Sequence, residues 1–321
     1  MKNSEAIFEQ GLANKKVSSM MKAMQGWETS LASSSEPPSG QFGRVVKIQT
    51  NDLTITNDLD LEFEVPFDDD TEANEATIKV YNLTKSTIGR LVVDKEISIT
   101  AGYGKDTGVI FSGVVSSVKT RWSGQDKVTT IMAIDSESLK EKDIESIAFN
   151  AGVKASYILK TLVGKVNLPN AVFEIRRDHT YTEAVTVSGG LMSNIKEYAE
   201  VCGVSAYINK RKIYVRHLSK GDNLNFEVNV DTGLLDSPEE FREENVALTS
   251  SDKDKKKKAE FEKKFTDIIE GLTFKMLLEH RITTASIITL KSREHSGKYR
   301  VRSGKHICNE SEFYTEITAI E

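Results

Sequence analysis

The chain has 321 residues, of which 38% are hydrophobic and 28% charged, with a formal net charge of −5. This composition predicts a polar globular protein with room for two or three domains. It argues against sequence-independent binding of duplex nucleic acid, which requires concentrated Lys and Arg. No apolar run reaches the roughly 18–20 residues of a membrane span, and the N-terminus lacks the apolar core of a signal peptide. Cys202 and Cys308 form neither a disulfide framework nor a zinc motif, so we expect synthesis and assembly in a reducing cytoplasm.

The first 41 residues are predicted to form a separate N-terminal arm. Apolar side chains recur there at roughly helical spacing until the segment SLASSSEPPSG interrupts the pattern. One interpretation is a partly disordered leader. The other is an amphipathic helical arm that docks on a partner, with methionines as adaptable anchors. The anchors of such an arm are Phe8, Leu12, Met20, Met21, Met24 and Trp27.

Residues 42–140 are predicted to form a first all-β domain. Short segments rich in β-branched residues are separated by turn residues, which is typical of such a unit. An acidic loop, FDDDTEANEA, lies between two of the expected strands. A short helix is expected in YNLTKSTIGRL, where Thr84 is a suitable N-cap and Ile88 and Leu91 share one side.

The segment GYGKDTG in this domain raises the possibility of a phosphate-binding loop. Such a loop requires G-x-x-x-x-G-K-[ST] at the start of a helix. Here Lys105 lies between the glycines, and the residues after Gly108 are β-branched and aromatic. The pattern therefore predicts the tight corner of a β-hairpin and no nucleotide site.

Residues 141–220 are predicted to form a small mixed α/β domain of two helix-plus-strand units. ASYILKTLVGKVNL and GGLMSNIKEYAEVCG carry apolar residues at helical spacing, and Gly203 ends the second helix. VSAYINKRKIYVRHL then predicts a hairpin with a tight turn at NKRK.

Residues 221–321 are predicted to form a second β domain that ends in four strands. A polar, Lys-rich interruption at 251–271 is expected to be helical, because Phe261, Phe265, Ile268, Ile269 and Leu272 share a helical face. Its lysine cluster at 255–258 is interpreted either as a solvated loop or as a basic contact with an acidic neighbour.

No constellation of catalytic residues stands out. The histidines show no metal-binding spacing, neither cysteine has a nucleophile signature, and no G-x-S-x-G elbow occurs. We therefore predict no catalytic, cofactor-binding or metal-binding residue and no cofactor. The chain has the features of a binding or structural protein. The five histidines are His179, His217, His280, His295 and His306.

Several motifs, in this order along the chain, together resemble the phage baseplate hub family, also called late control protein D-like proteins. The resemblance runs through EATIKVYNLTKSTIGRL, ISITAGYGKDTGVIFSGVVSSVKTRW, GLMSNIKEYAEVCGVSAYINKRKIYVRHL, VDTGLLDSPEE and the closing block from LLEHR to the C-terminus. The residues that carry it are Tyr103, Gly104, Phe111, Ser112, Gly113, Thr232, Gly233, Leu234, Leu235, Ser237, Pro238, Gly297, Tyr299, Val301 and His306. Two departures are Ala285, where the family often has glycine, and HICNES in place of its usual H-x-G-D.

The resemblance implies an α+β, mostly β fold with two related β-barrel domains, which flank the mixed domain. It implies a homotrimer whose paired barrels form a pseudo-sixfold ring between the tail tube and the central spike. Further implied partners are other baseplate (wedge) proteins and the tape measure protein. No membrane span and no stable nucleic-acid binding are expected. The implied location is the tail baseplate of a virion or tail-like particle assembled in the bacterial cytoplasm, contractile injection systems and tail-like bacteriocins included.

Asp68, Asp69, Asp70 and Glu72 are candidates for an acidic channel lining, which would avoid tight binding of phosphate; a solvated turn is the other interpretation of this loop. Two alternatives to the hub remain at this point. One is a tail-associated peptidoglycan hydrolase, which would need an acid–base or Cys/His set. The other is a carbohydrate-binding tail-tip protein, which would need clustered exposed aromatic side chains.

Overall fold

The computed structural model describes residues 43–50, 53–135, 142–217, 219–244 and 268–321. These residues belong to one compact unit, and the fold is mostly β, as predicted. The predicted arm and its six anchors lie outside the described residues, as does the Lys-rich stretch up to residue 267. No helix in the described ranges is long and apolar enough to cross a membrane.

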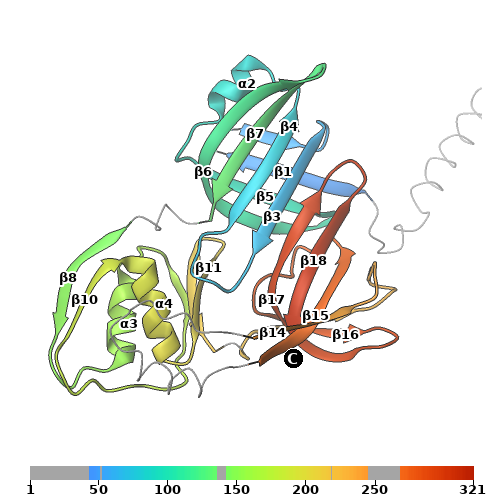
Figure 1. Ribbon diagram of the computed structural model, residues 1–321. Coiled ribbons are helices and arrows are strands. Elements are labelled where there is room, and N and C mark those ends of the chain that lie inside the picture. The colour runs from blue at the N-terminus through green and yellow to red at the C-terminus, as the bar shows by residue number, and fades with distance from the viewer. Residues whose placement is uncertain (1–42, 51–52, 136–141, 218, 245–267) are drawn as a thin grey trace, which may run out of the picture. The chain divides into compact units, whose positions relative to one another are not determined.

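The first β module comprises seven strands and one short helix (Figure 1). Alternate residues of its strands point into one core, as in β3, where Leu61, Phe63 and Val65 are buried. The elements are β1 (Arg44–Thr50), β2 (Leu53–Thr56), β3 (Leu61–Phe67), β4 (Glu75–Tyr81), α2 (Lys85–Arg90), β5 (Glu96–Tyr103), β6 (Asp106–Ser123) and β7 (Asp126–Ile134).

Two local predictions in this module are confirmed. Thr84 is the N-cap of α2, and its hydroxyl accepts a hydrogen bond from the Thr87 N–H at 3.1 Å. The segment GYGKDTG joins β5 to β6, with Gly104 at φ +52. A strand follows where a phosphate loop requires a helix.

The mixed segment has its own hydrophobic core, to which α3 and α4 contribute one face each. The two helices lie side by side (Figure 1). Gly203, at φ +68, terminates α4, as predicted. Lys210 and Arg211, both at positive φ, form the tight turn of the predicted hairpin. The elements are β8 (Asp143–Phe149), α3 (Ala155–Gly164), β9 (Asn170–Phe173), β10 (Val185–Gly190), α4 (Leu191–Val201), β11 (Ser205–Asn209) and β12 (Lys212–Arg216).

The second β module contains the four predicted final strands and two more. One prediction for it is wrong: Ile268, Ile269 and Leu272 belong to a strand, so the expected helix does not extend to residue 271. The physical reason is that β15 lies between β14 and β18 in the sheet, and this pairing overrides the helical spacing. The elements are β13 (Asp222–Val228), β14 (Glu239–Glu244), β15 (Ile268–Leu277), β16 (Ser286–Lys291), β17 (Ser296–Cys308) and β18 (Phe313–Ile320).

The two β modules share one order of hydrogen-bonded strands. In the first, the order is β1-β5-β6-β7-β4-β3; in the second, it is β13-β16-β17-β18-β15-β14. Taken in chain order, each strand of one module therefore corresponds to one strand of the other, with β2 as an addition. The two modules differ in the direction of one strand pair: β1 and β5 are antiparallel, whereas β13 and β16 are parallel.

A seam of antiparallel pairing between β3 and β17 joins the two modules into one sheet (Figure 1). Gly304 lies opposite Phe67, and Cys308 lies opposite Phe63. The pairings of the described strands form an open path from β14 to β2 and do not close into the predicted barrels. The modules are thus continuous through the seam.

Ala285, a residue that departs from the family motif, has an unusual backbone conformation. Its φ is +63, in the left-handed region that favours glycine, and its side chain is fully buried. Its N–H donates to Val301 O and its carbonyl accepts from Asp222 N–H, both at 2.8 Å. These contacts fix the turn before β16 despite the missing glycine.

Candidate functional site

The acidic loop of residues 68–74 joins β3 to β4 and is tied to the second module. Asp69 Oδ2 lies 3.0 Å from Arg300 NH1, and Asp69 Oδ1 lies 3.6 Å from Arg302 Nε. Arg300 also donates through Nε to Lys220 O at 2.9 Å, and its side chain is only 3% exposed. Asp69 is therefore the partner of a buried guanidinium.

The other acidic residues of the loop differ in exposure. Burial, reinforced by the charge of Asp70, raises the pKa of Asp68 from its ordinary value to about 7. Asp70 and Glu72 are exposed, and the Asp70 carboxylate accepts from the Glu72 N–H at 2.6 Å. Of the four residues predicted to line a channel, these two present side chains to solvent; their role in a channel stays a prediction.

A buried polar pair holds the end of this loop against the mixed segment. Asp135, at the end of β7, accepts from both Asn74 N–H and Asn74 Nδ2, each at 3.0 Å. The same Nδ2 lies 3.2 Å from Ile208 O in β11, and the next residue, Asn209, donates to Thr283 Oγ1 at 2.6 Å. The β11–β12 hairpin thus contacts both β modules, and we call this place the three-way junction.

The pKa of Asp135 makes the stability of the three-way junction depend on pH. Burial raises this pKa from 3.8 to about 7. Between about pH 4 and 7 the folded protein retains a proton that the unfolded chain has lost, so this group's contribution to stability falls as pH rises.

We expect the unfolding free energy of the wild type, relative to Asp135→Asn, to fall between pH 4.5 and 7.5. Urea unfolding at several pH values measures it, with the exposed Asp58→Asn as control. If the unfolding free energies of the wild type and of Asp135→Asn change with pH in parallel, the raised pKa of Asp135 is contradicted.

Two histidines lie inside the protein near the same junction. Burial lowers the pKa of His306 to about 3, and its ring nitrogen lies 2.9 Å from Thr315 Oγ1. The ring of His280 lies against Gly108, where a Cβ atom would collide with it. Among the residues that the structure describes, no group of three or more His, Cys, Asp or Glu is placed to hold a metal ion. Both histidines have packing roles here.

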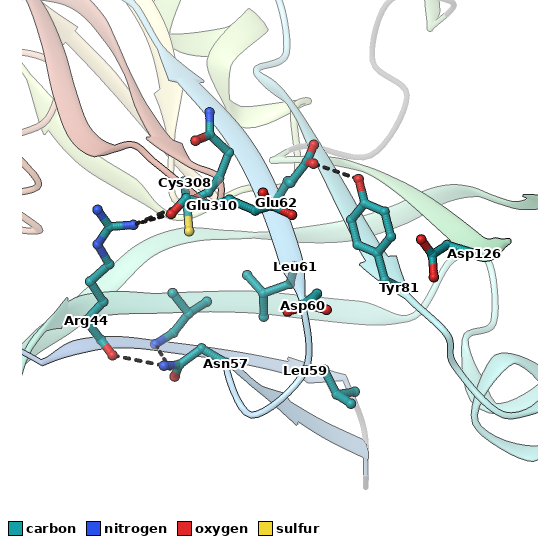
Figure 2. A pocket seen from close by; sticks show the side chains of 12 residues that line it. Arg44, Asn57, Leu59, Asp60, Leu61, Glu62, Tyr81, Asp126, Cys308 and Glu310 are labelled. Carbon is teal, nitrogen blue, oxygen red and sulfur yellow. Dashed lines mark hydrogen bonds between the residues drawn. The ribbon is translucent and has the colours of Figure 1, made fainter. Parts of the chain in front are cut away.

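A pocket of about 220 Å³, lined by both polar and apolar side chains, lies on the first module beside the β17–β18 turn (Figure 2). Tyr81 donates to Glu62 Oε1 at 2.6 Å, which lowers the pKa of Glu62 and raises that of Tyr81 to about 12. Arg44 donates to the carbonyl oxygens of Asn309 and Glu310. Figure 2 shows Tyr81 turned toward Glu62 on one side of the pocket and Arg44 turned toward the β17–β18 turn on the other.

The repeated β module, joined edge to edge within one chain, is shared with tail proteins. The tail protein from Neisseria meningitidis MC58 superimposes with a TM-score of 0.59 over 87% of this chain and 97% of its own, at 8% identity. The 43 kDa tail protein of prophage MuSo2 from Shewanella oneidensis superimposes with a TM-score of 0.62 over 87% of this chain and 98% of its own, at 6% identity. The E. coli c3393 protein is a type VI secretion component described as similar to T4 tail proteins gp27 and gp5. It superimposes with a TM-score of 0.55 over 85% of this chain and 76% of its own, at 11% identity.

The fold is therefore that of phage tail proteins. The family model described as Baseplate hub gp41 matches residues 42–250, which is more than half of the chain. The chain belongs to this baseplate hub family, as its motifs predicted. No curated protein matches the sequence significantly.

Proposed function

We propose that this chain is a structural hub protein whose copies form a homotrimeric ring between a tail tube and a central spike. The observation that carries the proposal is the strand order that occurs twice in each chain. Three copies with two equivalent modules each present six similar units, which suit a sixfold tube on one side and a threefold spike on the other. Heterologous contacts between such copies close into a ring.

The remaining partners and the location follow from this role. Wedge proteins would bind the outside of the ring, and a tape measure protein would reach it through the tube. The ring would lie in the tail baseplate of a phage or tail-like particle assembled in the bacterial cytoplasm. Asp70 and Glu72, both exposed, are the residues we assign to an acidic channel lining. We assign no catalytic residue and no cofactor.

The test is the mass of the purified chain, alone and after co-expression with the tube and spike proteins from the same source. Light scattering is expected to give three copies per particle, alone or in the complex. A monomer in both preparations would refute the proposal. Peptidoglycan cleavage on a zymogram would instead favour a tail-associated hydrolase, and glycan binding would favour a carbohydrate-binding tail-tip protein.

A further inference from the structure

The two longest strands, β6 and β17, occupy equivalent positions in their modules. Each is paired on one side with its hairpin partner, β7 or β18, and on the other side with β5 or β16. Each also carries a bulge at the same place: after Val115, which lies opposite Ala133, and after Val301, which lies opposite Ala319. The bulge therefore aligns the two strands residue by residue.

Beyond the bulge the two strands differ in their surroundings. Residues Gly304–Cys308 of β17 pair with β3 and form the seam. The equivalent part of β6, residues 118–122, pairs with β7 alone among the described strands. Figure 1 shows this end of the β6–β7 hairpin extending past β4, and Trp122 near its tip is 73% exposed. An edge of this length offers unpaired N–H and C=O groups to another strand.

The strand equivalent to β3 is β14, which also has an open edge. In the described residues β14 pairs with β15 alone. In the second module, Glu239 lies opposite Thr273 of β15. In the first module, Glu64 lies opposite Thr77 of β4. Thr273 and Thr77 are themselves equivalent, because each lies opposite an equivalent residue of the next strand, β18 or β7. Glu239 therefore occupies in the second module the place that Glu64 occupies in the first.

We propose that β6 of one copy pairs antiparallel with β14 of a second copy, repeating between copies the seam that β17 and β3 form within one chain. The alignment at the bulge makes Arg121 equivalent to Ile307, which lies opposite Glu64. Arg121 therefore lies opposite Glu239 of the neighbouring copy, with opposite charges facing each other across the strands.

The charges of the two edges support a second copy of this chain as the occupant. Lys119 is the equivalent of Lys305, whose Nζ lies 3.6 Å from Glu64 Oε1 in the internal seam. The same ion pair therefore recurs between copies as Lys119 with Glu239. Lys119 and Arg121 lie two positions apart, so both project from the face of the paired strands on which Glu239 lies. Two basic side chains of one copy therefore meet the Glu239 carboxylate of the other.

This pairing rests on the proposed ring and specifies its contact. Because β6 and β14 are different edges of the chain, each copy uses one edge for each neighbour, and the contact is head-to-tail. Internal and external seams then alternate around the ring, so that every module meets its neighbours in the same way.

A disulfide tests the register directly. In the full chain, Arg121→Cys combined with Glu239→Cys is expected to give chains linked to one another under mild oxidation, because opposed residues of paired strands have Cα atoms within disulfide range. The native Cys202 and Cys308 are buried. Either single variant, and Arg121→Cys combined with the exposed Glu145→Cys, serve as controls that should stay unlinked. Failure of the double variant to link in particles of trimeric mass would overturn the pairing and leave the proposed function standing.

A charge exchange gives an independent readout. Arg121→Glu or Glu239→Arg alone is expected to weaken self-association at least about tenfold, because like charges then face each other. The double variant is expected to recover most of it, because the exchanged charges attract each other again although Lys119 then faces a like charge. Single variants that associate like the wild type, or a double variant that fails to recover, would contradict the proposed register. A wild-type chain that stays monomeric even with tube and spike partners would refute both this pairing and the proposed ring.

Discussion

Asp69→Ala is expected to lower the unfolding free energy by about 3–5 kcal/mol, the cost of leaving a buried charge without its partner. Arg300 is 3% exposed, so its guanidinium cannot turn to water when the carboxylate is removed. One of its nitrogens, NH2, already lacks a hydrogen-bond partner among the described residues. Urea-induced unfolding followed by circular dichroism measures the loss.

Two comparisons separate this effect from general damage to the loop. Asp70→Ala, an exposed change one residue away, is expected to cost less than about 1 kcal/mol. Combining Asp69→Ala with Arg300→Met removes both charges and should recover much of the stability. If the double variant is no more stable than Asp69→Ala, the unpaired guanidinium is not the cause of the loss.

Gly304→Ala is expected to cost about 3 kcal/mol, because the added methyl group has no space in the seam. A Cβ atom at this position would collide with the carbonyl oxygen of Glu316 in β18 and would lie 2.7 Å from the ring of Phe67. The carbonyl oxygen of Glu316 belongs to the backbone of a paired strand, and this backbone can move away only if the sheet opens. Thermal unfolding of the purified variant measures the effect.

Gly297→Ala is the matched control because the residue lies on the same strand. Its nearest neighbour would be the ring of Tyr299 at 3.4 Å, an ordinary van der Waals contact. We expect its unfolding free energy to stay within about 1 kcal/mol of the wild type. Equal losses for the two glycine variants would mean that general strand propensity, and not the close contact at the seam, determines the cost.

Most individual elements were predictable because their signals are local. Alternation of apolar residues located the strands, helical spacing located α3 and α4, and Thr84 and Gly203 marked helix ends. The strand pairings between modules were not predictable, since β3 and β17 lie more than 200 residues apart in the chain. The helical interpretation of Ile269 and Leu272 failed for the same reason, because distant strands determine the conformation of β15.

The acidic loop shows how far a single sequence locates functional residues. Its composition singled out Asp68 to Glu72, but nothing nearby in sequence indicated that Asp69 pairs with Arg300 in β17. Asn74 and Asp135 were missed altogether. The only local signal was an aspartate directly after a strongly apolar strand, a position where a buried carboxylate needs a specific partner.

The seam between β3 and β17 also has a consequence for biosynthesis. The ribosome releases β3 some 240 residues before its partner, which at about 5–20 residues per second is a delay of roughly 10–50 s. During that interval the nascent N-terminal half has an open strand edge, which is prone to pairing with other nascent chains. We therefore expect the yield of correctly folded chain to fall at high expression rates and to rise when translation is slowed or chaperones are supplied.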